Sequence, residues 1–130
     1  MENDKREIAV NSESLLSDIQ DAFSICYPFL LMEFFRKSRS LAPLRQIRLE
    51  PLGNIKALDD PAASHVIDVG SLRTVAEVAQ EIAGITGAVV KISRKSGSVW
   101  NVISLTDGWT LERQNAAGEY ISRLMAGSKQ

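Results

Sequence analysis

Two copies of an Arg-Lys-Ser triplet are the residues of this chain best suited to hold an anion. One copy is Arg36-Lys37-Ser38 and the other is Arg94-Lys95-Ser96. A serine hydroxyl beside two cations can hold a phosphate. We expect each triplet at a strand end, with the two strands on opposite edges of one sheet, so the copies are not expected to form one site. Solvated charges that discourage strand pairing are the favoured interpretation. The candidate anion contacts are Arg36, Lys37, Arg94 and Lys95.

Side chains that could act as acids, bases or metal ligands are sparse. His65 is the only histidine, and it shares a short expected strand with Asp68. A lone histidine is more often a polar group at a strand end than a catalyst. Asp59-Asp60 lies in a proline-flanked turn without the spaced oxygen ligands of a calcium loop. We therefore assign no catalytic residue, no metal ligand and no cofactor. An enzyme is the alternative, with a pocket under residues 39–64 and with His65, Asp68 or Arg45 nearby.

Length and composition indicate one globular domain. The chain has 130 residues, of which 45% are hydrophobic and 24% are charged, and its formal net charge is −1. This balance of charge gives no overall attraction to a polyanion. The single cysteine, Cys26, allows no intramolecular disulfide and no multi-cysteine metal site, which fits a reducing compartment.

A basic stretch is the best argument for binding to nucleic acid. It begins beside Phe35 and comprises Arg36, Lys37, Arg39, Arg45 and Arg48. A binder of single-stranded RNA with the expected fold would place stacking aromatic side chains on its two central strands. Those strands, expected over residues 8–10 and 65–69, carry no aromatic side chain except the imidazole of His65. We therefore do not favour nucleic acid as a partner.

Nothing in the sequence predicts insertion into a membrane. The first seven residues are polar and lack the apolar stretch of a secretory signal. The longest apolar run, residues 27–32, is too short to cross a bilayer. We expect a cytoplasmic protein without membrane contact.

The chain repeats itself, and this repeat decides the expected fold. Ile8-Ala9-Val10 followed by Ser12 recurs 59 positions later as Ile67-Asp68-Val69 followed by Ser71. Both copies lead into a helical pattern of apolar residues, and the offset falls to 58 at the two Arg-Lys-Ser triplets. Two β-α-β units in tandem predict an α+β fold of the ferredoxin-like kind, in which helices cover one antiparallel sheet.

We expect a single domain over residues 1–130. The boundaries are 7–38 for the first β-α-β unit, 39–64 for an irregular connection, 65–96 for the second unit and 98–126 for an added hairpin strand and a C-terminal helix. Prolines and a glycine interrupt the connection, although alternation over residues 45–52 suits an extended ribbon.

Capping signals place the helices. Thr74 and Glu77 form a capping box before the second helix, and Pro28 ends the first helix. Thr110 is expected to cap the C-terminal helix. The expected inward positions of that helix are Leu111, Ile121, Leu124 and Met125.

One face of the expected sheet is more apolar than a solvent-exposed sheet face usually is. Alternation along the strands places Met32 and Ile92 under the helices. In the final hairpin we expect Lys95 opposite Ser98, a register that turns Trp100 toward the other face. The expected interaction surface on that face consists of Phe29, Leu31, Phe35, Val89, Trp100 and Val102. Residues 39–64, the C-terminal helix, a second copy of the chain or a small ligand could cover it.

Residues 94–100 (RKSGSVW) and 106–115 (TDGWTLERQN), together with the apolar run 29–35, resemble a set of small bacterial α+β proteins to which no activity is assigned. The resemblance implies a stand-alone bacterial domain in the cytoplasm. It carries over no ligand and no catalytic residue.

These observations favour a non-enzymatic binding or protein-interaction module that associates with itself through the expected interaction surface. A small-molecule-binding domain or an enzyme, with a pocket under residues 39–64, is the first alternative. A nucleic-acid-binding module is the second alternative.

Overall fold

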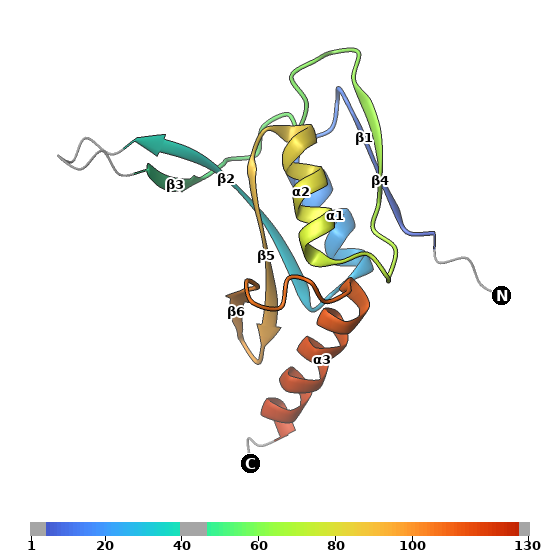
Figure 1. Ribbon diagram of the computed structural model, residues 1–130, viewed down its shortest axis with the longest axis vertical. Helices are drawn as coiled ribbons and strands as arrows, with labels where there is room; N and C mark the ends of the chain where they lie inside the picture. The colour runs from blue at the N-terminus through green and yellow to red at the C-terminus, as the bar shows by residue number, and fades with distance from the viewer. Residues whose placement is uncertain (1–4, 40–46, 128–130) are drawn as a thin grey trace.

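The computed structural model of the chain describes residues 5–39 and 47–127. These residues form an α+β fold, as the sequence predicts (Figure 1). The elements are β1 (Glu7–Asn11), α1 (Leu16–Cys26), β2 (Leu30–Arg39), β3 (Ile47–Pro51), β4 (Ser64–Asp68), α2 (Val75–Thr86), β5 (Val89–Ser96), β6 (Val99–Val102) and α3 (Leu111–Gly127).

Helices α1 and α2 lie between two antiparallel sheets (Figure 1). One sheet is the two-stranded ribbon β1–β4, and the other has four strands in the order β3-β2-β5-β6. The core fills the space between the helices and both sheets. It includes Val10 and Ile67 from the ribbon and Met32 and Ile92 from the larger sheet, all at most 2% exposed. Apolar residues at helical spacing complete it from the helices: Leu16, Ile19 and Phe23 of α1, and Val75, Val78 and Ile82 of α2.

Helix α2 begins and ends as its sequence predicts. The Thr74 hydroxyl accepts a hydrogen bond from the Glu77 backbone N–H at 3.1 Å, and the Glu77 carboxylate accepts one from the Thr74 N–H at 2.9 Å. This capping box satisfies two backbone donors at the start of the helix. Gly87 ends the helix in the left-handed region, at φ 75°, and donates its N–H to the Ala83 carbonyl.

The ferredoxin-like arrangement is wrong, because the strands are ordered differently. Strands β1 and β4 pair with each other, as that fold requires, but they form a separate sheet. Strands β2 and β5, expected on opposite edges, are neighbours at the centre of the larger sheet. The physical reason is that alternation decides which face of a strand is buried but does not decide which strand lies beside it. The two long strands satisfy each other's backbone groups along a ladder of six residue pairs.

Residues related by the sequence repeat meet in both strand pairs. In the β1–β4 pair Ile8 lies opposite Ile67, which is 59 positions later in the sequence. In the β2–β5 pair Glu33 lies opposite Lys91, which is 58 positions later. These separations are the two offsets of the repeat.

The last hairpin turns later than expected. Ser96 pairs with Val99 and Lys95 with Trp100, so the turn residues are Gly97 and Ser98 rather than Ser96 and Gly97. Gly97 has φ 68°, a conformation that two-residue hairpin loops use and that glycine adopts without strain. The expected pairing of Lys95 with Ser98 is therefore wrong by two residues. A shift of two keeps Trp100 on the expected face.

The connection that the sequence predicts over residues 39–64 contains a strand. Strand β3 pairs antiparallel with the second half of β2, from Pro51 opposite Phe35 to Ile47 opposite Arg39. Residues 40–46, which belong to the expected irregular connection, lie outside the described residues. After β3 the chain returns to the start of α1, where Leu15 forms a bridge with Lys56.

Helix α3 packs across one end of the larger sheet. Its buried residues are Leu111, Gln114 and Gly118. Leu124 is 58% exposed and Met125 is 44% exposed, so these two expected inward positions are wrong. Gly118 faces the sheet: a Cβ atom added there would lie 3.0 Å from the Cβ atom of Phe29.

Candidate interaction surface

The face of the larger sheet that points away from α1 and α2 is the candidate site, and we call it the outer sheet face. Alternation along the strands and the observed registers assign its residues. Its apolar members are Leu31 and Phe35 of β2, Ile47 and Leu49 of β3, Val89 of β5, and Trp100 and Val102 of β6. Its charged members near the centre are Glu33 and Lys91, with Lys37 and Lys95 toward the two ends.

The structure brings five of the six expected interaction residues together on this face, and the sixth lies elsewhere. Phe29 precedes β2 and lies beneath α3, where its Cβ atom and carbonyl oxygen are the near neighbours of Gly118. Its side chain lines a hollow between α3 and the β5–β6 turn, together with Ser122 and Met125. Phe29 is therefore part of the contact between α3 and the sheet.

Sequence reasoning missed the contribution of β3 to the outer sheet face. Ile47 is 61% exposed and Leu49 is 43% exposed, and both point to the same side as Phe35. The alternation of these two apolar residues with Arg48 and Glu50 was the signal for a half-buried strand. The sequence did not show that this strand pairs with β2.

No described element of the chain covers the outer sheet face. Strand β3 extends the sheet at its edge instead of crossing the face, and α3 lies on the same side as α1 and α2 (Figure 1). Trp100 remains 38% exposed and Val102 55% exposed, while Leu31, Phe35 and Val89 are half-buried. Within residues 5–39 and 47–127, neither of the two intrachain covers that we considered is present.

The described charged side chains of this face are one glutamate and three lysines. Glu33 and Lys91 lie opposite each other on the two central strands. The Lys95 ammonium lies 5.8 Å from the centre of the Trp100 ring, within the range of a cation–π contact. The face therefore combines exposed apolar groups with one acid and several bases.

The two Arg-Lys-Ser triplets lie far apart, as expected, but for a different reason. Because β2 and β5 are antiparallel neighbours, Arg94 lies opposite Leu30 at the start of β2 while Arg36 lies near the other end of that strand. Each arginine also has a protein partner. Arg36 Nε donates to the Glu50 carboxylate at 3.1 Å, and an Arg94 guanidinium nitrogen donates to Gln114 Oε1 at 3.1 Å.

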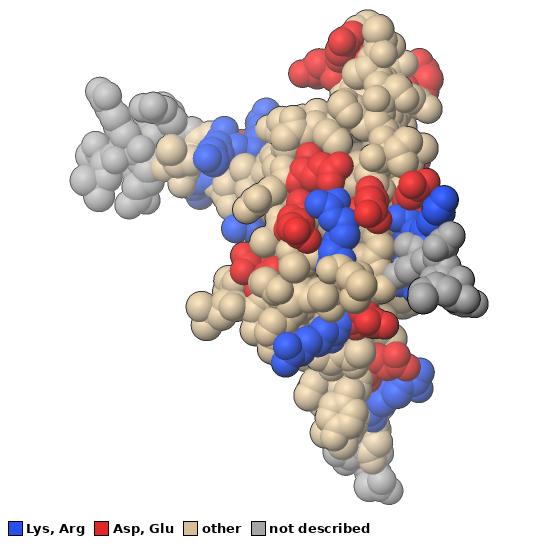
Figure 2. Space-filling model, turned by 45° about the vertical axis from the view of Figure 1, so that its right-hand side comes forward, with Lys and Arg blue, Asp and Glu red and all other residues tan. Residues whose placement is uncertain are grey.

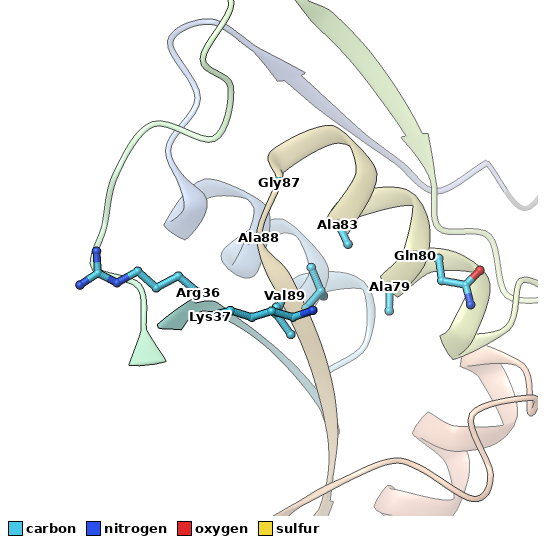
Figure 3. Close-up of a pocket in the computed structure, with 9 residues that line it drawn as sticks. Arg36, Lys37, Ala79, Gln80, Ala83, Gly87, Ala88 and Val89 are labelled. Carbon is cyan, nitrogen blue, oxygen red and sulfur yellow. The ribbon is translucent and has the colours of Figure 1, made fainter. Parts of the chain in front are cut away.

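A hollow of about 700 Å³ lies where α2 meets the first residues of β5 (Figure 3). Small residues make up much of its lining: Ala79, Ala83, Gly87 and Ala88, together with Gln80, Val89 and Val90. Arg36 and Lys37 stand at its rim, and Figure 3 shows their side chains extending in opposite directions.

A small hollow lies beneath the described part of residues 39–64, and two of the three polar residues expected near it lie elsewhere. A hollow of about 150 Å³ lies between α1 and the residues that follow β3, lined by Gln20, Glu33 and Asn54 among others. Neither His65 nor Asp68 lines it, since both are exposed on β4, and Arg45 lies outside the described residues. In the described parts of the chain, no three His, Cys, Asp or Glu side chains are grouped so that they could hold a metal ion.

Acidic and basic side chains are interspersed on the face shown in Figure 2. No helix among the described residues is both long enough and apolar enough to cross a membrane. Comparisons with protein-family models, with curated proteins and with solved structures found no match to this chain. The resemblance of residues 94–115 to small bacterial proteins therefore stays a prediction.

Proposed function

We propose that this protein is a non-enzymatic interaction module that forms a homodimer through its outer sheet face. The observation that carries the proposal is the exposure of large apolar side chains, Trp100 and Leu49 among them, on a sheet face that no described element covers. These side chains form an apolar patch on each side of the Glu33–Lys91 pair, and exposed apolar patches mark interaction sites in soluble proteins. We further propose that the dimer acts in the cytoplasm of a bacterium.

An internal duplication supports a second copy as the occupant. We infer that the chain consists of two related β-α-β-β units, because corresponding residues make corresponding hydrogen bonds. The Leu16 N–H donates to the Ile55 carbonyl, and the Val75 N–H, 59 positions after Leu16, donates to the Trp109 carbonyl. The outer sheet face then has an approximate internal two-fold axis between Glu33 and Lys91. Most homodimers are built from self-complementary surfaces.

The central charges make the face self-complementary. A two-fold axis parallel to the strands would place Glu33 of one copy over Lys91 of the second copy, and Lys91 over Glu33. Two such copies would bury the apolar residues on both sides of these charges. Charge pairs of this kind contribute more to register and specificity than to affinity.

The test is the mass of the protein in solution. We expect a dimer by sedimentation velocity, and a monomer when Trp100→Ser and Phe35→Ser are combined, with the helix content unchanged by circular dichroism. Leu72→Ser is the matched control, since Leu72 is 78% exposed and lies in the turn before α2. A wild-type chain that stays monomeric at all accessible concentrations would falsify the proposal.

A charge reversal tests the orientation of the two copies. Glu33→Lys alone is expected to weaken the dimer, because it places like charges across the interface. Combining it with Lys91→Glu restores opposite charges and is expected to restore the dimer. If the double variant is as weak as the single one, the proposed axis is wrong.

Single-stranded nucleic acid is the second candidate, and the strand order favours it more than the sequence did. The central strands of the larger sheet are β2 and β5, so Phe35 lies on a central strand, with Trp100 and three lysines on the same face. Aromatic side chains beside cations can stack bases and hold phosphates. Titration with single-stranded DNA at low and high salt separates the two candidates, because phosphate contacts weaken steeply as salt rises.

A further inference from the structure

Helix α3 packs against one end of the larger sheet through specific polar contacts. Gln114 accepts a hydrogen bond from Arg94, and the Asn115 side chain accepts one from the Phe29 N–H at 2.8 Å. Gly118 brings the helix close to both Phe29 and Arg94. Ser122 then contacts the strand end, where its hydroxyl lies 3.4 Å from the Lys95 carbonyl. This end of the sheet is therefore a helix-binding seat.

The residues that correspond to this seat in the other unit line the hollow beside α2. At the offset of 58, Arg36 corresponds to Arg94 and Lys37 to Lys95. Gly87 and Ala88 correspond in the same way to Phe29 and Leu30. All four corresponding residues line the 700 Å³ hollow (Figure 3). No described helix fills it.

Several side chains around the hollow are smaller than their counterparts, although Gln80 replaces the shorter Asp21. At the offset of 59, Ala79 replaces Gln20 and Ala83 replaces Ser24. The Gln20 amide donates to the Met32 carbonyl at 2.9 Å and covers the free edge of β2. Ala79 has no side-chain donor, so it cannot make the corresponding bond to Val90 on the free edge of β5. Small residues spaced four apart on a helix also let another helix approach closely.

We propose that this hollow binds an amphipathic helix of a partner protein. The helix would carry a glutamine or glutamate toward Arg36 and a glycine or alanine four positions later, which is the pattern of Gln114 and Gly118 in α3. The Lys37 ammonium at the rim favours the acidic version of this pattern, while Arg36 is also paired with Glu50. The inference rests on the internal duplication, and it does not require the homodimer.

The partner's helix is a better occupant than α3 of a second copy. In its own chain α3 already uses Gln114, Asn115 and Gly118 for its seat. Insertion of α3 into a second copy would require that seat to open. A helix laid into an apolar groove is also a common mode of peptide recognition.

A peptide with the sequence of residues 110–127 is the probe, because it carries the proposed pattern. We expect a fluorescent form of this peptide to bind the full chain, whose own seat stays filled by its tethered α3. NMR of the labelled chain is expected to show shifts at Ala79, Ala83 and Ala88. Absence of binding, or shifts confined to the outer sheet face or to the seat of α3, would overturn the proposal.

Variants in the two units provide the matched control. Ala83→Glu is expected to weaken peptide binding by about tenfold or more, because it fills the hollow and adds a charge. Ser24→Glu makes the corresponding change on α1, outside the lining of the hollow, and is expected to leave binding unchanged. Equal losses in both variants would contradict the inference.

The same variants separate this inference from the proposed dimer. Ala83→Glu is expected to leave the mass of the protein in solution unchanged, while Trp100→Ser is expected to leave peptide binding unchanged. Failure of one test therefore does not decide the other.

Discussion

The two halves of the molecule share a backbone plan but differ in what their side chains leave open. Around α1, Gln20 covers the edge of β2 and the neighbouring end of the sheet is filled by α3. Around α2, Ala79 stands in place of Gln20 and a hollow remains. The comparison indicates that smaller side chains in one half leave open a surface that larger groups cover in the other half.

The two helices also differ in how they begin. The side chain of Thr74 caps α2, whereas Leu15, its counterpart before α1, has no side chain that can accept a hydrogen bond. At α1 the Asp18 carboxylate accepts from the Leu15 N–H at 2.8 Å, so one of the two bonds of a capping box is kept. The corresponding starts of the two helices therefore differ in their number of capping hydrogen bonds, two at α2 and one at α1.

The largest expected effect tests whether the two halves share one core. Phe23 of α1 and Ile82 of α2 are corresponding residues, and each is 0% exposed. Truncating them to alanine is expected to lower the free energy of unfolding by about 3–5 kcal/mol for Phe23→Ala and about 2–5 kcal/mol for Ile82→Ala. Chemical denaturation followed by tryptophan fluorescence and by circular dichroism, at one fixed protein concentration, measures both.

One cooperative transition is expected for each variant, with the two signals coinciding. The reason is that both side chains belong to a single buried cluster. If Phe23→Ala gave two separate transitions, the halves would have to be treated as independent units, and the comparison between them would lose its basis.

The next prediction compares the effect of a glycine-to-alanine change on stability at two helix positions. One position packs against the sheet and the other is open. Gly118 of α3 faces Phe29, where an added Cβ atom would lie 3.0 Å from the Phe29 Cβ and 3.2 Å from its carbonyl oxygen. Gly84 of α2 has no heavy atom within 4 Å of such a position. Alanine favours a helix over glycine by about 1 kcal/mol. We expect Gly84→Ala to stabilise the protein by about 0.5–1 kcal/mol.

Gly118→Ala is expected to destabilise the protein by about 1 kcal/mol, since the overpacking outweighs the gain in helix propensity. Thermal unfolding of the two variants under identical conditions compares them directly. A Gly118→Ala variant as stable as Gly84→Ala would show that α3 can move away from the sheet without cost, and its seat would no longer serve as the reference for the hollow.

Local signals in the sequence predicted the helices well. The capping box of Thr74 and Glu77 and the apolar spacing of α1 act over a few residues, so they could be recognised without knowledge of the fold. The choice of neighbouring strands depends on contacts between distant residues. For this reason the sequence did not predict that β2 pairs with β5 at the centre of the larger sheet. It also did not predict that β1 and β4 form a sheet of their own.

The outer sheet face could be predicted in large part because it depends on alternation. Leu31 and Phe35 follow from the pattern of β2 alone, and a register error of two residues did not move Trp100 to the other side. Phe29 could not be placed correctly, because its position depends on the approach of Gly118. The hollow beside α2 had no sequence signal, because it results from small side chains that look unremarkable until their counterparts in α1 are compared.

The smallest expected effect concerns the helix starts and depends on pH. The backbone N–H of Thr74 donates to the Glu77 carboxylate and lowers its pKa, with smaller contributions from the Thr74 hydroxyl and from Arg73. A carboxylate whose pKa is lower in the folded state stabilises the protein above the pKa of the unfolded chain, and this contribution is lost as the pH falls through the folded pKa. Glu77→Gln is therefore expected to reduce stability slightly at neutral pH and to bring no further loss in acid. Urea denaturation from neutral pH down to about pH 3, below the ordinary pKa of a glutamate, measures the difference between wild type and variant. The difference in free energy of unfolding should shrink as the pH falls. If the free energies of the two proteins instead changed in parallel with pH, the cap of α2 would not depend on the charge of Glu77. The two helices would then begin more alike than their hydrogen bonds indicate.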